Sequence, residues 1–102
     1  MNLVKARTVL DSPIHSPARL SIVAPLYTVE SIDYQTLKNE LGMSYALLTK
    51  HATLLENAGI ISIKKEFSGK TAVTRLALTK QGRKEYELYL AALDTLVRGF
   101  AH

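Results

Sequence analysis

The break at Gly42 and Met43 constrains the fold of this chain more than any other feature of its sequence. Asp33 is a typical N-cap for a first short helix, and Gly42 follows where a helix end favours a left-handed residue. Ser44 can then cap a second helix over 44–58. Two short helices joined by a turn of about three to four residues with a glycine are typical of a helix-turn-helix.

Upstream of this pair, the sequence predicts one further helix that begins at Ser16 and Pro17. Serine is a good N-cap, and proline is tolerated at the first helical position, where the N–H would lack a partner anyway. Pro25 removes a backbone donor within the helix, so a kink or an early stop near Ala24 is expected. Residues 1–12 have only weak helical spacing and are left unassigned.

Downstream, the apolar spacing changes from a helical period to alternation, which predicts a strand over 60–66. A turn over 67–70 and a second strand over 71–78 complete a hairpin. Thr79 can cap a last helix over 80–98. A hairpin that follows a helix-turn-helix is a wing.

The predicted fold is therefore mainly α with a small β-hairpin (α+β), a winged helix-turn-helix with an additional C-terminal helix. Its 102 residues suit one domain over 1–102. Within it, 13–78 would form the winged-helix core and 79–98 a C-terminal dimerisation helix.

Positive charge is concentrated in the middle of the chain, in the segment 44–84. This segment holds eight basic and two acidic residues (8 − 2 = +6), whereas the remainder holds five and seven (5 − 7 = −2). Segregated positive charge favours an acidic partner such as nucleic acid.

The helix over 44–58 is predicted to bury Leu48, Ala52 and Leu55 and to expose the opposite face to DNA. That face is small and polar, with one cation and no acid, so it can approach base edges, and the N–H groups of its first turn can bind a phosphate. The alternative is that its aromatic and leucine residues pack on the preceding helix and its threonines are only solvated. The predicted contacts on this helix are Ser44, Tyr45, Ala46, Leu47, Thr49, Lys50 and Thr53.

The wing over 64–71 is predicted to contact the phosphate backbone or the minor groove beside the helix. The alternative is a solvated hairpin whose lysines serve solubility. The predicted contacts are Lys64, Lys65, Lys70 and Thr71.

The last helix has an apolar stripe that is wider than one small domain needs, which predicts a homodimer. Two copies would place two recognition helices about 34 Å apart, matching successive turns of a palindromic site. The predicted interface residues are Tyr86, Tyr89, Leu90, Leu93, Leu96 and Val97.

Other function classes find little support in the sequence. The chain has no cysteine, and His15, His51 and His102 lack metal-ligand spacing, so no cofactor or metal is expected. His15 is predicted to be a packed or capping residue, and His51 a partly buried structural residue. No catalytic constellation, signal peptide or membrane-length apolar run is present, so a cytoplasmic protein that is not an enzyme is expected. The sequence does not indicate whether a small effector binds.

Three segments resemble motifs of small winged-helix transcriptional regulators related to the MarR and ArsR regulators. They are LDSPIHSPARL at 10–20, LTKHATLLENAG at 48–59 and FSGKTAVTRLALTKQG at 67–82. The resemblance implies a dimeric bacterial or archaeal regulator with the helix from Ser44 in the major groove. It also implies that the reading positions are Tyr45, Ala46, Leu47, Thr49 and Lys50.

This sequence departs from the family pattern at Ala52, where leucine is usual, at Leu47, where a polar residue is common, and at Pro25. The predicted function is a sequence-specific transcriptional regulator that binds double-stranded DNA. The alternative is a winged helix used for protein–protein interaction without DNA binding, because the fold alone does not determine function.

Overall fold

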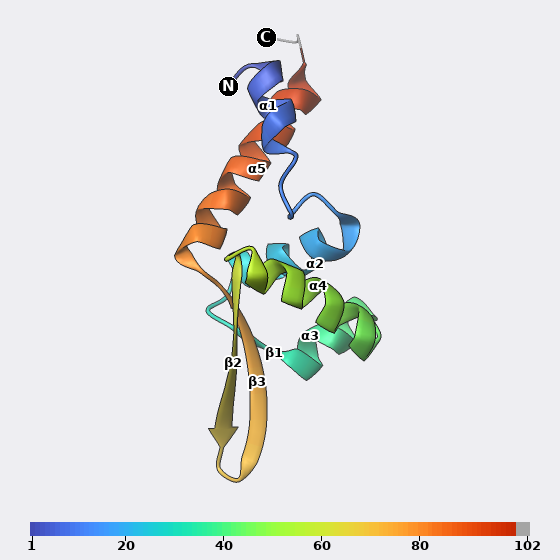
Figure 1. The fold of residues 1–102 in the computed structure, drawn as a ribbon, viewed down its shortest axis with the longest axis vertical. Coiled ribbons are helices and arrows are strands. Elements are labelled where there is room, and N and C mark those ends of the chain that lie inside the picture. The colour runs from blue at the N-terminus through green and yellow to red at the C-terminus, as the bar shows by residue number, and fades with distance from the viewer. Residues whose placement is uncertain (100–102) are drawn as a thin grey trace.

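The computed structural model describes residues 1–99 of the chain and confirms the predicted winged-helix architecture (Figure 1). Helices and a three-stranded antiparallel sheet form one hydrophobic core. The elements are α1 (Leu3–Val9), α2 (Pro17–Tyr27), β1 (Ile32–Asp33), α3 (Tyr34–Leu41), α4 (Tyr45–Asn57), β2 (Ile61–Ser68), β3 (Thr71–Leu78) and α5 (Lys80–Arg98).

The helix ends follow the capping residues of the sequence. The side chains of Ser16, Asp33, Ser44 and Thr79 each accept a hydrogen bond from the backbone N–H three residues later. Gly42 adopts the left-handed conformation, with φ of 63°, and ends α3. The helix-turn-helix that these caps predicted is confirmed.

A kink or an early stop near Ala24 was predicted for the helix that begins at Pro17, and the early stop is wrong, because α2 continues through Pro25 to Tyr27. Its buried residues Ile22, Val23 and Leu26 lie on both sides of the proline. Packing along this whole stretch therefore maintains the helix despite the missing N–H. The unassigned N-terminal segment forms α1, which is capped by Asn2 and packs along α5.

The sheet has the order β1-β3-β2, and its first strand was not predicted. A two-residue strand has too little sequence pattern to be recognised; it pairs Ile32 with Leu76 and Asp33 with Arg75 on β3. Strands β2 and β3 pair along their full length, from Ile61 opposite Leu78 to Ser68 opposite Thr71. The wing therefore has a third strand only at its base.

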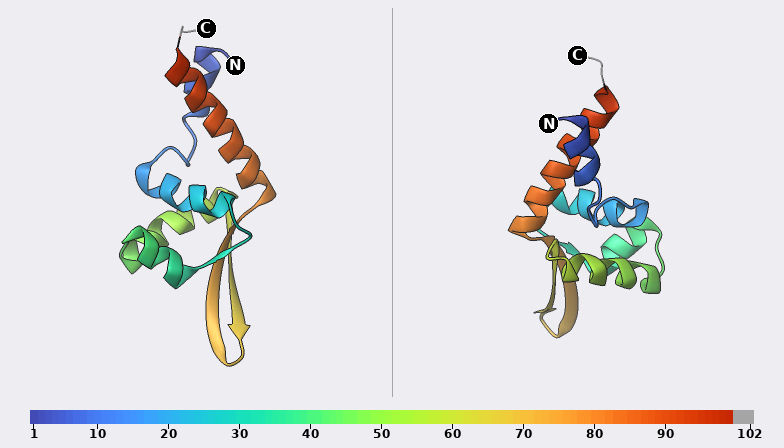
Figure 2. Two further views of the ribbon diagram at one scale, coloured as in Figure 1. Left: turned by 180° about the vertical axis from the view of Figure 1, so that it is seen from behind. Right: turned by 45° about the horizontal axis from the view of Figure 1, so that its top comes forward.

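Figures 1 and 2 show an elongated molecule, with the α1–α5 pair projecting from one end of the body and the β2–β3 hairpin from the other. The radius of gyration is 15.3 Å, whereas roughly 12.8 Å is expected for a compact chain of this length. No helix among residues 1–99 combines the length and apolar character that a bilayer span requires.

The buried face of α5 differs from the predicted interface stripe. Tyr86 and Tyr89 belong to the chain's own core, so these two side chains have little surface to offer a second copy. Leu90 and Val97 remain 41% and 78% exposed. The sequence placed all of them on one face, but contacts from α1 and α2 cover only part of it.

Candidate nucleic-acid interface

Helix α4 is fixed along one side and open along the other. Leu48, Ala52 and Leu55 are buried as predicted. The Ser44 hydroxyl accepts a hydrogen bond from the Leu47 N–H at 3.1 Å. The unpaired N–H groups of the first turn therefore belong to the two residues between them, Tyr45 and Ala46. These two N–H groups lie at the positive end of the helix dipole, where an anion is favoured.

The predicted contact residues of α4 are not equally accessible. Tyr45 is 66% exposed, and Leu47, Lys50 and Thr53 are exposed as well. Thr49 is only half-buried, between α4 and α3. The open face of α4 thus consists of exposed side chains and of Thr49, which is held by a neighbouring residue.

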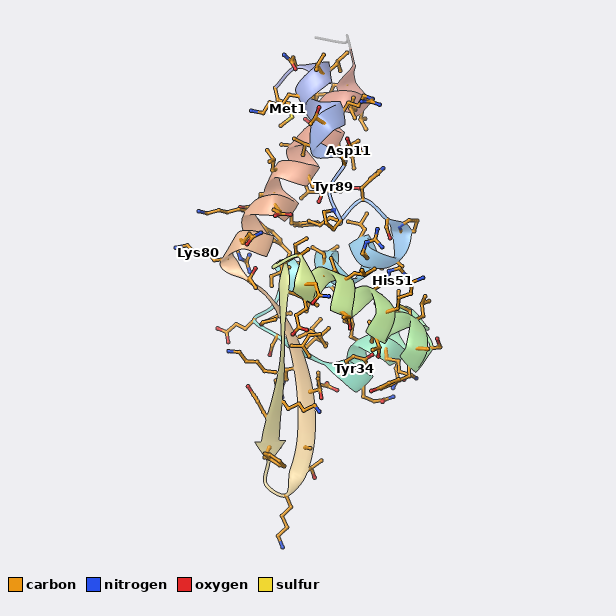
Figure 3. The ribbon with its side chains drawn as sticks, viewed as in Figure 1. Met1, Asp11, Tyr34, His51, Lys80 and Tyr89 are labelled. Carbon is orange, nitrogen blue, oxygen red and sulfur yellow. The ribbon has the colours of Figure 1, made fainter. Side chains whose placement is uncertain are left out.

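That neighbour is Tyr34, the first residue of α3, which sequence reasoning missed (Figure 3). Its hydroxyl forms a hydrogen bond with Thr49 Oγ1 and donates a second one, at 3.4 Å, to the carbonyl of Tyr45. The rings of Tyr34 and Tyr45 pack at 5.5 Å between centroids. The alternative that Tyr45 packs on the preceding helix therefore holds in part, because its ring contacts Tyr34 of α3 and is still largely exposed. An aromatic residue directly after a helix cap is the only local signal of this role.

The two adjacent lysines of the wing lie on opposite faces of the hairpin. Lys65 shares the face of Ile61 and Ile63, which pack toward the core, because side chains alternate along a strand. Lys64 lies on the other face, directly opposite Arg75, whose guanidinium pairs with the carboxylate of Glu66 at 3.5 Å. Sequence reasoning grouped the two lysines, although the alternation of β2 could have separated them.

A hollow of about 480 Å³ lies between α3, α4 and the wing. Lys65 and Thr74 line its wing side, and Thr49 and Thr53 line its α4 side. Asp33 lies at its α3 side, where hydrogen bonds from Thr36 keep the carboxylate occupied and lower the pKa of Asp33. Tyr34, Gln35, Tyr45, Ala52, Ile63, Ala72 and Val73 complete the lining.

The tip of the wing is exposed on all sides. Gly69 has φ of 66° and lies with Lys70 in the two-residue turn, and Thr71 begins β3. Lys70 and Thr71 are exposed, as is the aromatic ring of Phe67. Within residues 1–99, neither Lys65 nor Lys70 is in an ion pair. Both charges are therefore open to an anion from outside.

Two histidines lie between elements of the body: His51 is partly buried, as predicted, whereas His15 is exposed and contacts the core through Tyr89. His51 on α4 lies 3.3 Å from an Arg19 Nη1 of α2, and Arg19 Nε donates to the carbonyl of Pro13 at 2.5 Å. Burial, then the charges of Arg19 and Lys50, lower the pKa of His51. His15 Nδ1 and the Tyr89 hydroxyl are 3.0 Å apart. Among residues 1–99, no three potential ligands gather around a possible metal position.

The comparison with known families agrees with this geometry. Residues 18–97 match the family of winged helix DNA-binding domains, and the chain belongs to this family. An uncharacterized protein of Methanocaldococcus jannaschii, MJ0432, is 29% identical over 76 residues, which cover 74% of this chain and 83% of that protein.

Solved structures with a similar fold are MarR-like transcriptional regulators. A transcriptional regulator homologue from Pyrococcus horikoshii OT3 superposes with a TM-score of 0.86 at 21% identity, over 94% of this chain and 96% of that one. NadR in complex with 4-hydroxyphenylacetate has a TM-score of 0.70 at 26% identity, over 93% and 67%. Overoxidized AbfR bound to DNA has a TM-score of 0.73 at 18% identity, over 89% and 66%. The family is thus that of winged helix DNA-binding domains, and the fold is shared with a transcriptional regulator homologue and with a protein bound to DNA.

Proposed function

We propose that this protein is a sequence-specific transcriptional regulator that places the helix over 44–58 in the major groove of double-stranded DNA. The wing over 64–71 lies on the adjacent backbone and minor groove. The observation that carries this proposal is the hollow, onto which both the polar face of α4 and the Lys65 face of the wing open. One strand of a duplex bound at both surfaces passes between them.

Base selection is assigned to the open face of α4. Thr53 and Thr49 present hydroxyl and methyl groups to base edges, Lys50 reaches guanine or phosphate, and Leu47 suits a thymine methyl. Ser44 holds the first turn so that the N–H groups of Tyr45 and Ala46 receive a phosphate. No acidic side chain of α4 lies among these groups, so the face does not repel the duplex.

Affinity is assigned mainly to the wing. Lys65 faces the hollow and Lys70 and Thr71 lie at the tip, so these residues meet the backbone that leaves the major groove. Lys64, on the opposite face of the hairpin, contributes to the local positive potential. Such contacts act on any DNA sequence and weaken as salt rises.

Selection of duplexes from fragmented genomic DNA, followed by binding measurements across a salt series, tests this assignment. Each lost phosphate contact should lower the log–log salt slope by about 0.9, so Lys64→Ala/Lys65→Ala/Lys70→Ala should lower it by up to about 2.7. The matched control removes three exposed lysines elsewhere, Lys5, Lys80 and Lys84. No enrichment of any duplex by the wild type would contradict the function, and equal slopes in both variants would contradict the wing assignment.

We also propose that the protein acts as a homodimer through its C-terminal helix, 79–98, beside a winged-helix core over 13–78. The exposed Leu90 and Val97 continue the half-buried stripe of Leu93 and Leu96 on α5. The chain exposes 6616 Å², whereas roughly 5700 Å² is expected for a compact monomer of this mass. The excess surface favours a partner on the projecting α1–α5 pair.

Size-exclusion chromatography with light scattering tests the dimer. The wild type should elute at twice the chain mass of 11.3 kDa, and Leu90→Asp/Val97→Asp should elute at the single mass because a buried carboxylate pair disfavours association. Val29→Asp, at an exposed apolar position outside α5, serves as the control. A monomeric wild type at micromolar concentration would remove the proposal.

A further inference from the structure

Phe67 leaves an aromatic ring in water near the tip of the wing, where it is 77% exposed. Its cross-strand partner is Ala72, whose methyl group is too small to cover a phenyl ring. The ring thus forgoes the free energy that burial of an aromatic side chain provides. A bound partner can supply that burial.

The ring lies on the same side of the molecule as the open face of α4. Phe67 follows Lys65 by two residues and Ile63 by four, so the three side chains share one face of β2. That face lines the hollow beside α4 at Ile63 and Lys65. Whatever occupies the hollow and extends along the wing therefore meets the ring.

The length of the free hairpin matches the geometry of DNA. From Ile63, which packs against the core, to Gly69 at the turn are six residues, or about 20 Å of strand. The centres of a major groove and the next minor groove are about 17 Å apart, half of the roughly 34 Å helical turn. With α4 in the major groove, the end of the wing reaches the neighbouring minor groove.

The surroundings of the ring specify the chemistry of its partner. The segment 64–71 holds three lysines and one glutamate (3 − 1 = +2). Lys65 precedes the ring on its own face, and Lys70 follows it in the turn. A partner that accepts an apolar ring between cations has apolar surfaces framed by anions, which describes stacked bases between two phosphate backbones.

We propose that Phe67 is an apolar wedge that enters the minor groove and partly unstacks a base step there. Pyrimidine–purine steps deform most easily, so the wedge selects duplexes with such a step half a turn from the site that α4 reads. Phe67 would thereby add sequence preference without a hydrogen bond to any base. This inference rests on the proposed DNA-binding function and adds a contact that the lysines do not provide.

The test uses the duplex that the wild type selects, with 2-aminopurine in place of adenine at a T–A step half a turn from the α4 site. Wild-type protein should raise the 2-aminopurine fluorescence, which reports unstacking. Phe67→Ala should abolish the rise and weaken binding by roughly tenfold with an unchanged salt slope, because the lost contact is apolar. Phe67→Leu should retain the rise, since leucine also acts as a wedge.

Two controls separate this contact from charge and from surface changes in general. Lys70→Ala should lower the salt slope by about 0.9 and retain the fluorescence rise. Val29→Ala, at another exposed apolar position, should change neither the salt slope nor the fluorescence rise. Circular dichroism should show native helix content in every variant, because these side chains lie outside the core.

Wild-type affinity, or a fluorescence rise as large as that of the wild type, in Phe67→Ala would overturn the wedge while the lysine variants still report DNA binding. A change confined to the sedimentation of the DNA-free protein would also overturn it, in favour of a second copy as the partner of the ring. Absence of selected duplexes for the wild type would instead contradict the proposed function itself.

Discussion

Helix α4 is attached to the body along one whole face, whereas the wing beyond Lys65 is held only by its own two strands. Three buried residues, the Ser44 cap and the Tyr34 hydroxyl determine how α4 is presented. The outer half of the hairpin pairs only within itself, because β1 reaches no further than Leu76 and Arg75 on β3. Within the proposed interface, α4 is held rigidly by the body, whereas the outer half of the wing projects from it.

This difference suits two kinds of contact. Selection between bases requires groups held at defined positions, because a hydrogen bond weakens steeply when its geometry changes. Attraction to phosphates tolerates movement, since a charge acts over a Debye length of about 10 Å at 0.1 M salt. We therefore expect changes at the base of α4 to act through stability and selection, and changes in the wing to act through affinity.

The largest expected effect is loss of the α4 anchor by Leu55→Ala. The substitution removes a fully buried side chain and should lower the free energy of unfolding by about 2–5 kcal/mol in a urea titration at fixed protein concentration. The matched control is the neighbouring Leu54→Ala, at an exposed position, with an expected change within about 0.5 kcal/mol. Equal losses would show that α4 is not anchored on one face as described.

A smaller effect is expected where α4, the wing and α5 meet. A Cβ on Gly82 would lie 1.9 Å from the carbonyl oxygen of Ile60, one of the three residues between α4 and β2. Gly82→Ala should therefore shift this junction and cost about 1–3 kcal/mol of stability, measured by thermal and urea unfolding. Leu88→Ala, exposed on the same helix, is the control. A stable Gly82→Ala protein with normal DNA affinity would contradict a rigid junction.

Tyr34→Phe should weaken the attachment of α4 to α3 without creating a cavity in the hydrophobic core. It removes the hydroxyl that contacts Thr49 and the Tyr45 carbonyl, at a cost of about 0.5–1.5 kcal/mol. Discrimination between the selected duplex and its single-base variants should fall, whereas binding to unrelated DNA and the salt slope should not change.

The control for this change is Tyr27→Phe, which removes a hydroxyl that donates to Glu87 at 2.6 Å between α2 and α5. It should leave discrimination unchanged. If both variants discriminate equally well, Tyr34 has no part in presenting the recognition helix.

The smallest effect is expected from pH. Burial and neighbouring cations lower the pKa of His51 below its ordinary value of 6.5, so the folded protein favours the neutral ring. Below that value the unfolded chain binds more protons than the folded one, and stability falls as the pH decreases. Urea unfolding at pH 7.5 and 5.5 should show a smaller loss in His51→Gln than in the wild type. An identical loss would assign the pH dependence to other groups.

Much of the local structure was predictable because its causes are local. Ser44 and the Leu47 N–H that it caps are three residues apart, and Gly42 ends α3 through its own backbone conformation. The sequence also predicted the hairpin from alternation, although it read the turn as four residues where the structure has two. Even the opposite faces of Lys64 and Lys65 follow from that alternation.

The candidate interface was predicted only in outline, because its presentation depends on residues far apart in the chain. Tyr34 and Thr49 are separated by 15 positions, and nothing in the spacing of either residue indicates their contact. The exposed ring of Phe67 was likewise taken as part of a turn, although it ends the face that Lys65 begins. Pattern reasoning identified the charged and polar residues but not those that orient them.

The sequence by itself determined where α2, α3, α4 and α5 begin, the order of the helix-turn-helix, the hairpin and the last helix, and the family, because capping, period and motif are carried by neighbouring residues. Only the tertiary structure decided that α2 passes through Pro25, that β1 joins the sheet, and that Tyr86 and Tyr89 turn into the core while Leu90 does not. These outcomes depend on which surfaces meet. His15 and Tyr89, for example, lie 74 positions apart in sequence and in contact in the fold.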